Sequence, residues 1–285
     1  MRSNRRSVLY SSFRISHSSI HMHSDWIVPD WPAPANVHAV ITTRAGGVSS
    51  GPYESFNLGH TTGDDDASVD ANRARLRALL PGEPRWLRQV HGARVLEAEG
   101  VLDRPEADAA VATASDTVCA IMVADCLPVL FAERSGSVVA AAHAGWRGLA
   151  EGVIENTVHR MTARGAKARE VLAYIGPGIG PDAFEVGDDV YEAYTSRDAG
   201  AAAAFKAHTP GKWLADLPML ARHALERCGV TYIYGGGLCT YSDPRRFYSY
   251  RRDRTTGRMG AFIWRAGALR GGTGERTQGN QGSPP

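Results

Sequence analysis

The sequence predicts one compact domain in which strands and helices alternate along the chain. Short apolar runs rich in β-branched or aromatic residues recur, as at 37–43, 118–123 and 171–175, and such runs indicate β-strands. Between them lie stretches with apolar residues every three to four positions, as at 149–164, which indicate helices. No internal repeat and no linker interrupts residues 26–267, so we expect these residues to form a single domain.

Both ends differ from this body in composition. Residues 1–25 are rich in Arg, Ser and His, and residues 268–285 are rich in Gly, Ser, Pro and Gln. We expect both segments to be disordered, because neither has enough apolar residues to build a core. The Arg- and Ser-rich composition also resembles an organellar transit peptide, but a disordered extension, with Met22 as an alternative start, is the simpler interpretation.

Charge and cysteine content limit the classes of partner and compartment. The formal net charge is +2, and without the first 23 residues the chain carries 28 basic and 30 acidic residues, a net of −2. This balance does not favour a nucleic-acid partner. No apolar run approaches the ~18 residues of a membrane span. The four cysteines show no C-x-x-C spacing, which favours a reducing, cytoplasmic location.

The N-terminal half supplies weak signals for a site. A strand at 37–43 runs into a glycine-rich loop at 44–51, which would allow a ligand to approach the backbone closely. A helix beginning near Ala67 places Arg73 on its apolar face, where the guanidinium needs either an acidic partner or an anionic ligand. Residues 86–96 resemble a strand broken at His91 and Gly92, and a single histidine there is more often a core residue than a ligand.

The strongest local signal is a predicted hairpin at 126–143. Two β-rich runs, 127–133 and 138–142, are joined by a polar turn that contains Gly136. In an antiparallel hairpin the start of the first strand lies beside the end of the second, so Cys126 and His143 should meet at its open end. A thiolate beside an imidazole indicates either a zinc site or a Cys/His nucleophilic pair. Gly145 and Arg147 follow at the start of the 149–164 helix, where backbone N–H groups favour an anion.

Taken together, the motifs resemble one known family. They occur at residues 42–49, 57–59, 63–65, 72–73, 89–92, 124–129, 143–148, 175–177, 184–187, 239–240 and 249–252. Their order is similar to that of the family long labelled multicopper polyphenol oxidases or laccase-domain proteins, which are now regarded as zinc-dependent purine nucleoside phosphorylases. The resemblance covers about residues 37–264.

The resemblance implies a fold, a metal centre and an activity. The implied fold is α+β, a single domain of mixed β-sheets packed together with helices outside. The implied metal ligands are His91, Cys126 and His143, holding Zn²⁺, with copper as the alternative metal. The implied activities are phosphorolysis of adenosine, inosine, guanosine and methylthioadenosine, together with adenosine deamination. The expected partners are therefore purine nucleosides and phosphate, in a monomer or small homo-oligomer.

The chemistry assigns further candidate residues. Three protein ligands leave one tetrahedral position open, as in catalytic zinc sites, and water there ionises near pH 7. Asp125, next to Cys126, is a candidate proton shuttle for deamination. Arg44, Arg73 and Arg147 are candidate phosphate or substrate clamps, because guanidinium forks match phosphate, and Gly145 would offer backbone donors. Sequence spacing alone does not select among the arginines.

The sequence is also compatible with four other functions. A metal-free hydrolase would use Cys126 as nucleophile and His143 as base. A binding module would hold metal without turning over any nucleoside. Related proteins are linked to editing of peptidoglycan precursors. A copper phenol oxidase would need several His-x-His pairs to build its copper cluster, and the sequence has one, His21-x-His23, which lies in the N-terminal extension.

Overall fold

The computed structural model describes residues 22–267, and most of the predicted extension and tail, residues 1–21 and 268–285, lie outside the described residues. Thirteen strands form three sheets. A six-stranded sheet has the order β12-β8-β6-β7-β4-β3 and a four-stranded sheet the order β1-β13-β5-β2, while β10-β11-β9 form a small third sheet. The strands are β1 Val37–Ile41, β2 Pro84–Arg85, β3 Val95–Glu97, β4 Ala109–Ala112, β5 Val118–Val123, β6 Leu127–Glu133, β7 Val139–Ala144, β8 Val171–Ile175, β9 Glu185–Gly187, β10 Phe205–Ala207, β11 Lys212–Ala215, β12 Tyr232–Gly235 and β13 Met259–Arg265.

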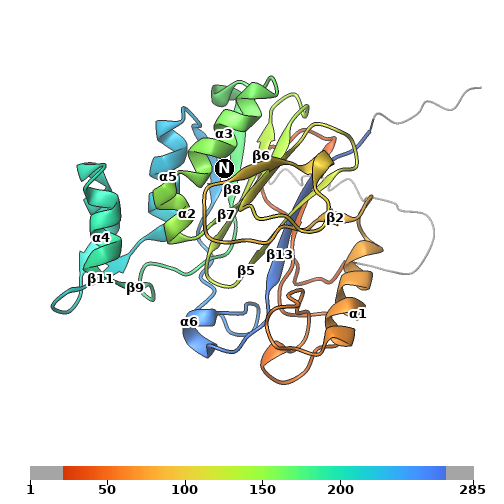
Figure 1. The fold of residues 1–285 in the computed structure, drawn as a ribbon, viewed down its shortest axis with the longest axis horizontal. Coiled ribbons are helices and arrows are strands. Elements are labelled where there is room, and N and C mark those ends of the chain that lie inside the picture. Colours follow the sequence, from red (N-terminus) through yellow and green to blue (C-terminus); the bar gives the residue numbers. More distant parts are fainter. Residues whose placement is uncertain (1–21, 268–285) are drawn as a thin grey trace, which may run out of the picture.

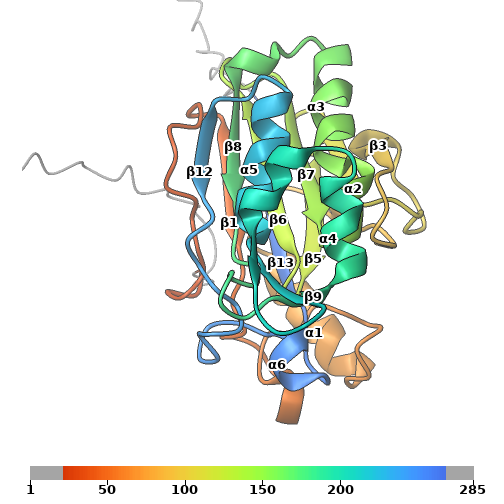
Figure 2. The ribbon, with the colours of Figure 1, turned by 90° about the vertical axis from the view of Figure 1, so that its left-hand side faces the viewer.

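Helices lie on the outer sides of the two large sheets, as Figures 1 and 2 show. They are α1 Asp66–Arg77, α2 Trp146–Glu151, α3 Val153–Ala163, α4 Asp188–Thr195, α5 Leu217–Arg227 and α6 Tyr250–Asp253. In Figure 1, α2, α3 and α5 lie on one side of the sheets and α1 (orange) on the other. The sheets are mixed, since β3–β4, β8–β12 and β2–β5 pair parallel whereas the other neighbours pair antiparallel. The predicted α+β domain of packed mixed sheets with helices outside is confirmed.

Three apolar layers hold the sheets and helices together. The first lies between the six-stranded sheet and the helices, the second between the two large sheets, and the third between the four-stranded sheet and α1. Along β6, Val129 and Phe131 face the first layer while Leu130 and Ala132 face the second. Side chains alternate across a strand, so a strand buried on both faces has a continuous apolar sequence. This explains why β6 and β7 show no polar alternation.

Two predicted elements differ in the structure. The predicted helix at 149–164 is split into α2 and α3 at Gly152, whose φ of +94° suits glycine and ends the first helix. The predicted strand at 86–96 is largely a loop between β2 and β3. Its backbone N–H groups at 90–92 bind the Asp108 carboxylate instead of a neighbouring strand. Among residues 22–267, no helix has the length and apolar character that crossing a membrane requires.

Candidate metal centre

The open end of the β6–β7 hairpin carries two of the predicted ligands. Cys126 directly precedes β6, and His143 is the second-last residue of β7. The antiparallel register pairs Leu127 with Ala144 and Pro128 with His143. The predicted hairpin is therefore confirmed, and it places the thiol and the imidazole side by side at its open end.

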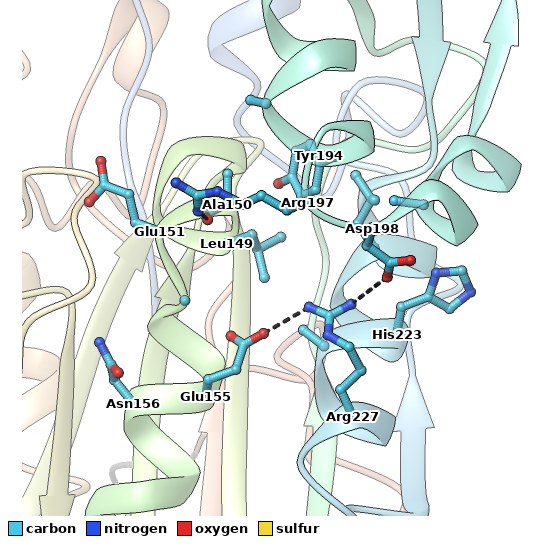
Figure 3. Close-up of a pocket in the computed structure, with 15 residues that line it drawn as sticks. Leu149, Ala150, Glu151, Glu155, Asn156, Tyr194, Arg197, Asp198, His223 and Arg227 are labelled. Atoms are coloured by element: carbon cyan, nitrogen blue, oxygen red, sulfur yellow. Dashed lines mark hydrogen bonds and ion pairs between the residues drawn. The ribbon is translucent and has the colours of Figure 1, made fainter.

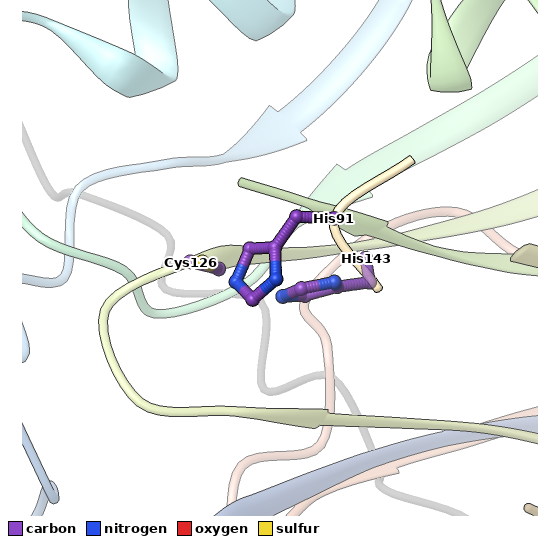
Figure 4. Close-up of side chains that lie close together, drawn as sticks. All are labelled: His91, Cys126 and His143. Carbon is purple, nitrogen blue, oxygen red and sulfur yellow. The ribbon is translucent and has the colours of Figure 1, made fainter. Parts of the chain in front are cut away.

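The third predicted ligand comes from a loop. His91 lies between β2 and β3 with a φ of +63°, a left-handed conformation that non-glycine residues seldom adopt. Its donor atom and those of Cys126 and His143 all lie within 4.8 Å of one another. Figure 4 shows the three side chains pointing toward one another. Among residues 22–267, no other cluster of His, Cys, Asp or Glu side chains gathers three such donors.

The donor set and its spacing fit a single metal ion. A tetrahedral zinc with bonds of ~2.0–2.3 Å sets its ligand atoms roughly 3.3–3.6 Å apart, so this group needs only a small closure to hold one. His143 is buried, whereas His91 is exposed and Cys126 half-buried. The centre is therefore open to solvent on the side of the loop, where a reactant could reach it.

Asp108 holds both histidines in place. Its side chain is fully buried, and its Oδ1 accepts a hydrogen bond of 2.8 Å from His143 Nδ1, which leaves Nε2 as the donor that faces a metal. The same carboxylate accepts backbone N–H groups from Val90, His91 and Gly92 at 3.2, 2.9 and 2.8 Å. Asp108 thus fixes the tautomer of one ligand and the strained backbone of the other, as carboxylates behind metal-binding histidines commonly do.

Without a metal, the electrostatics of the centre favour a thiolate at Cys126 beside a protonated imidazole at His143, which would lose its Nε2 proton when a metal binds. Burial opposes ionisation of Cys126, but the charge of His143 and hydrogen bonds from His143 and His91 outweigh it and lower the pKa of the thiol to about 6. Burial likewise disfavours charged His143, but Cys126 and Asp108 together raise the pKa of its imidazole to about 9. Hydrogen bonds from His143 and backbone amides hold the pKa of Asp108 below its ordinary value despite burial. The thiolate that a soft metal binds is therefore already the stable form at neutral pH.

Two glycines allow these parts to approach. A Cβ at Gly145 would lie 2.8 Å from Cys126 Sγ and 3.1 Å from a ring carbon of His91. A Cβ at Gly148 would lie 2.8 Å from the carbonyl oxygen of Gly92, in the loop that carries His91. The start of α2 therefore packs directly against the centre because it has no side chains at these two positions.

Comparison with known proteins agrees with this geometry. The family model described as multi-copper polyphenol oxidoreductase laccase matches residues 38–266, which includes all three donors. The chain belongs to this family.

Known relatives of this chain are similar to it over nearly their whole length. The purine nucleoside phosphorylase YfiH of Escherichia coli is 52% identical over 244 residues, 85% of this chain and 99% of that protein. The purine nucleoside phosphorylase PA4543 of Pseudomonas aeruginosa is 51% identical over 242 residues, 84% of this chain and 98% of that protein. The crystal structure of the Neisseria meningitidis protein NMB0706 is 49% identical with a TM-score of 0.82, over 85% of this chain and 100% of that one. The two relatives named purine nucleoside phosphorylases support an enzyme, and the three donors support a metal centre.

The three arginines that the sequence suggested as phosphate or substrate clamps contact mainly protein groups. Arg44 Nε donates to the Glu54 carbonyl at 2.8 Å and Nη1 to the Pro244 carbonyl at 2.9 Å. Arg73 Nε and Nη2 donate to the Leu58 carbonyl at 2.9 and 2.7 Å. The Arg73 guanidinium also lies 4.1 Å from the centroid of the Trp86 ring. Arg147 is exposed, with its guanidinium 4.6 Å from the centroid of its neighbour Trp146.

Asp125 has both carboxylate oxygens engaged. Oδ1 accepts the Thr240 hydroxyl at 2.6 Å and Oδ2 accepts the Arg251 backbone N–H at 2.7 Å, while the Asp125 carbonyl accepts the Ile179 N–H. Its φ is +87°, so the chain turns sharply just before Cys126. These contacts tie the segment carrying the thiol to three distant parts of the chain. They give physical reasons for the motifs at 239–240 and 249–252.

Sequence reasoning missed Asp108. The signal was present, because a single carboxylate stands between Ala107 and Ala109 at the start of a fully buried strand. A buried carboxylate almost always has hydrogen-bond or charged partners, so its position pointed to some polar group nearby. Which groups these were depends on β4 pairing with β7, and on the loop at 90–92 folding over its end.

A separate hollow of about 290 Å³ lies between α2, α3, α4 and α5, and Figure 3 shows the side chains that line it. None of the three candidate metal ligands lines it. The Arg227 guanidinium bridges Glu155 at 2.8 Å and Asp198 at 3.2 Å across this space. The Tyr194 hydroxyl donates to the Trp146 carbonyl at 2.6 Å. The Tyr194 contact joins α4 to α2, and the ion pairs of Arg227 join α5 to α3 and to Asp198.

Proposed function

We propose that this protein is a zinc-dependent purine nucleoside phosphorylase, acting on adenosine, inosine, guanosine and methylthioadenosine, that also deaminates adenosine. The observation that carries the proposal is the convergence of His91, Cys126 and His143 within 4.8 Å on one partly open site. The names of relatives about half identical over nearly their full length support the substrate class. Four unpaired cysteines support a reducing, cytoplasmic location.

The reaction requires an anion and a nucleoside to meet at one place. In phosphorolysis a phosphate oxygen forms a bond to C1′ of the ribose as the bond to the purine nitrogen breaks, and the base leaves with a proton. A zinc ion held by the three donors would supply a Lewis acid and an activated water molecule. Asp108 orients His143 and the loop of His91, Asp125 fixes the turn before Cys126, and Gly145 gives the space. We also propose that Arg44, Arg73 and Arg147, the candidate clamps, provide positive charge around the phosphate and the substrate.

Zinc suits this centre better than a copper-oxidase arrangement. A multicopper oxidase needs a second, histidine-rich cluster besides a His₂Cys site. In the part of the chain that the structure describes, the group at 91, 126 and 143 stands alone. A single N₂S site with an exposed histidine fits a catalytic zinc ion with one position left for a reactant.

The decisive experiment incubates the purified protein with adenosine, with and without inorganic phosphate, and separates the products by chromatography. Phosphate-dependent adenine and ribose 1-phosphate would establish phosphorolysis, and inosine would establish deamination. The absence of all three products, with zinc bound, would overturn both activities and leave a binding module or a Cys/His hydrolase.

A second candidate is a metal-free Cys/His hydrolase. It is favoured by one observation, the lowered pKa of Cys126 beside His143, which is the state of an activated thiol nucleophile. Chelation distinguishes the two functions. Removal of metal by dipicolinate should abolish phosphorolysis, and added zinc should restore it, whereas a thiol hydrolase would keep its activity through both steps and lose it to iodoacetamide.

A further inference from the structure

An arginine that the sequence motifs did not single out, Arg258, lies just before β13 with its stem fixed. Its backbone N–H donates to Asn57 Oδ1 at 2.8 Å, and its carbonyl accepts the Leu58 N–H at 3.1 Å. A Cβ at Gly59 would lie 2.9 Å from Arg258 Cγ, so the arginine stem occupies the space that a side chain would need there. The glycine of the motif at 57–59 therefore makes room for this arginine.

The guanidinium of Arg258 has one occupied and one free edge. Nη1 donates to the carbonyls of Thr256 at 3.1 Å and Gly257 at 3.0 Å. Nε and Nη2 donate to no atom of residues 22–267, and neither is among the buried polar atoms that lack a partner there, so both reach solvent. The Nε and Nη2 hydrogens point the same way and form the fork that binds two oxygens of one anion.

The charge of Arg258 is not neutralised by an acidic side chain. Within the described residues it forms no ion pair, although it is only partly exposed. Burial lowers its pKa, and the charged groups that oppose this effect are Cys126 first and then Asp125. β13 pairs antiparallel with β5, with Met259 opposite Val123, so Arg258 lies beside the segment that leads into Cys126. Both oxygens of Asp125 in that segment accept other hydrogen bonds, and the fork of Arg258 is unused.

Arg258 differs in this respect from the arginines chosen from the sequence. Arg44 and Arg73 each use Nε and a second nitrogen on backbone carbonyls, so their forks are already engaged. Arg147 is exposed on the first turn of a six-residue helix. A partly buried cation with a preformed free fork binds an anion more strongly than an exposed one, because less solvent screening weakens the attraction.

We propose that Arg258 forms the phosphate subsite beside the metal centre, its Nε and Nη2 hydrogens binding two oxygens of inorganic phosphate. This inference rests on the proposed function for the identity of the anion. It assigns to Arg258 the role of holding the attacking co-substrate, while the three metal-binding side chains act on the nucleoside side of the reaction.

The test compares Arg258→Gln with Arg258→Lys and with Arg245→Gln, a change at an exposed arginine in the preceding loop. In the zinc-loaded enzyme, Arg258→Gln should raise KM for phosphate by about 10- to 100-fold, the loss expected for a charge-assisted hydrogen-bonded pair. KM for the nucleoside and the zinc content should stay unchanged. Arg258→Lys should recover part of the phosphate affinity, since it keeps the charge but loses the fork.

A binding measurement separates failure of this inference from failure of the proposed function. Inorganic phosphate should raise the melting temperature of metal-free wild type and of Arg245→Gln, but not of Arg258→Gln. An unchanged phosphate KM, or an equal phosphate-induced shift in Arg258→Gln, would overturn the subsite. If wild type makes no ribose 1-phosphate, the phosphorylase proposal fails, and the melting experiment still decides whether Arg258 binds phosphate. Parallel circular dichroism and Arg258→Lys guard against a folding defect.

Discussion

Two of the candidate metal ligands stand on a sheet and the third stands on a loop, and the chain fixes them by different means. Cys126 and His143 are set by the register of the β6–β7 hairpin, which is buried on both faces. His91 has no strand around it, and its left-handed backbone is held by the Asp108 carboxylate. The comparison teaches that strand pairing brings two of the three ligands together, whereas one buried acid holds the loop of the third and orients the His143 ring.

Removing a ligand from the hairpin should have the largest effect. We expect Cys126→Ser and His143→Ala each to reduce zinc content and nucleoside turnover by at least about 100-fold, because even a residue behind a ligand is worth ~10–100-fold. Metal analysis of the purified variants and product chromatography check this. Cys239→Ser is the matched control, since Cys239 lies outside the donor group and should keep full zinc. Retained zinc and turnover in Cys126→Ser would remove the thiol from the centre.

Weakening the support of the loop should have the next largest effect. Asp108→Asn keeps the shape of the side chain but removes the charge that accepts from His143 and three backbone N–H groups. We expect zinc affinity to fall about 10- to 100-fold. Competition with a fluorescent zinc chelator measures the change. Wild-type affinity in Asp108→Asn would show that the loop holds its shape without the carboxylate.

The same comparison shows how far the sequence predicts this molecule. The hairpin contact between Cys126 and His143 followed from strand pairing, and the strands at 37–43, 118–123 and 171–175 lie within two residues of those observed. His91 and Asp108 could not be joined in this way, because their contact depends on a loop folding over the end of a strand, and the two residues are 17 positions apart. Local patterns carry no information about such long-range placement, and only the family resemblance supplied His91.

The fates of the arginines follow the same rule. The position of Arg73 on the buried face of α1 was predictable, but its use was not, because backbone carbonyls and aromatic rings satisfy a guanidinium as well as an acid does. Arg258 carries no sequence signal of its own. Its free fork depends on the turn at 256–257 occupying Nη1.

Alkylation of the metal-free protein should report how strongly the two histidines act on the thiol. The pKa of Cys126 is lowered to about 6, so its thiolate predominates above pH 6 and is lost as the pH falls below that value. At pH 7 a thiol with this pKa is about 30 times more ionised than an ordinary thiol of pKa ~8.5. We therefore expect iodoacetamide to modify Cys126 faster than an ordinary thiol. Peptide mass mapping across roughly pH 4–10 locates the pH at which modification of Cys126 is half-maximal. A midpoint near that of an ordinary thiol would contradict the close contact with His143.

Substitutions of the two glycines at the start of α2 should have the smallest effect, and they distinguish contacts with the ligands from contacts with the loop of His91. Gly145→Ala places a methyl group against Cys126 and His91, whereas Gly148→Ala places one against the Gly92 carbonyl. We expect each to cost about 1–3 kcal/mol of stability through overpacking. Gly145→Ala should also weaken zinc binding more than Gly148→Ala, because it displaces ligands directly. Urea unfolding measures the loss of stability, and zinc titration measures the metal affinity. Equal zinc affinities in the two variants would mean that α2 shifts to make room for the methyl group and the ligands keep their places.

The most direct test of the account is X-ray absorption at the zinc edge of the zinc-loaded protein. With His91, Cys126 and His143 as the protein ligands, the spectrum should require one sulfur at ~2.3 Å, two imidazole nitrogens at ~2.0–2.1 Å and one further light atom from solvent or a reactant. Cys126→Ser should lose the sulfur contribution. A spectrum without sulfur, or one with a fourth protein ligand in place of the exchangeable atom, would contradict an open three-ligand centre.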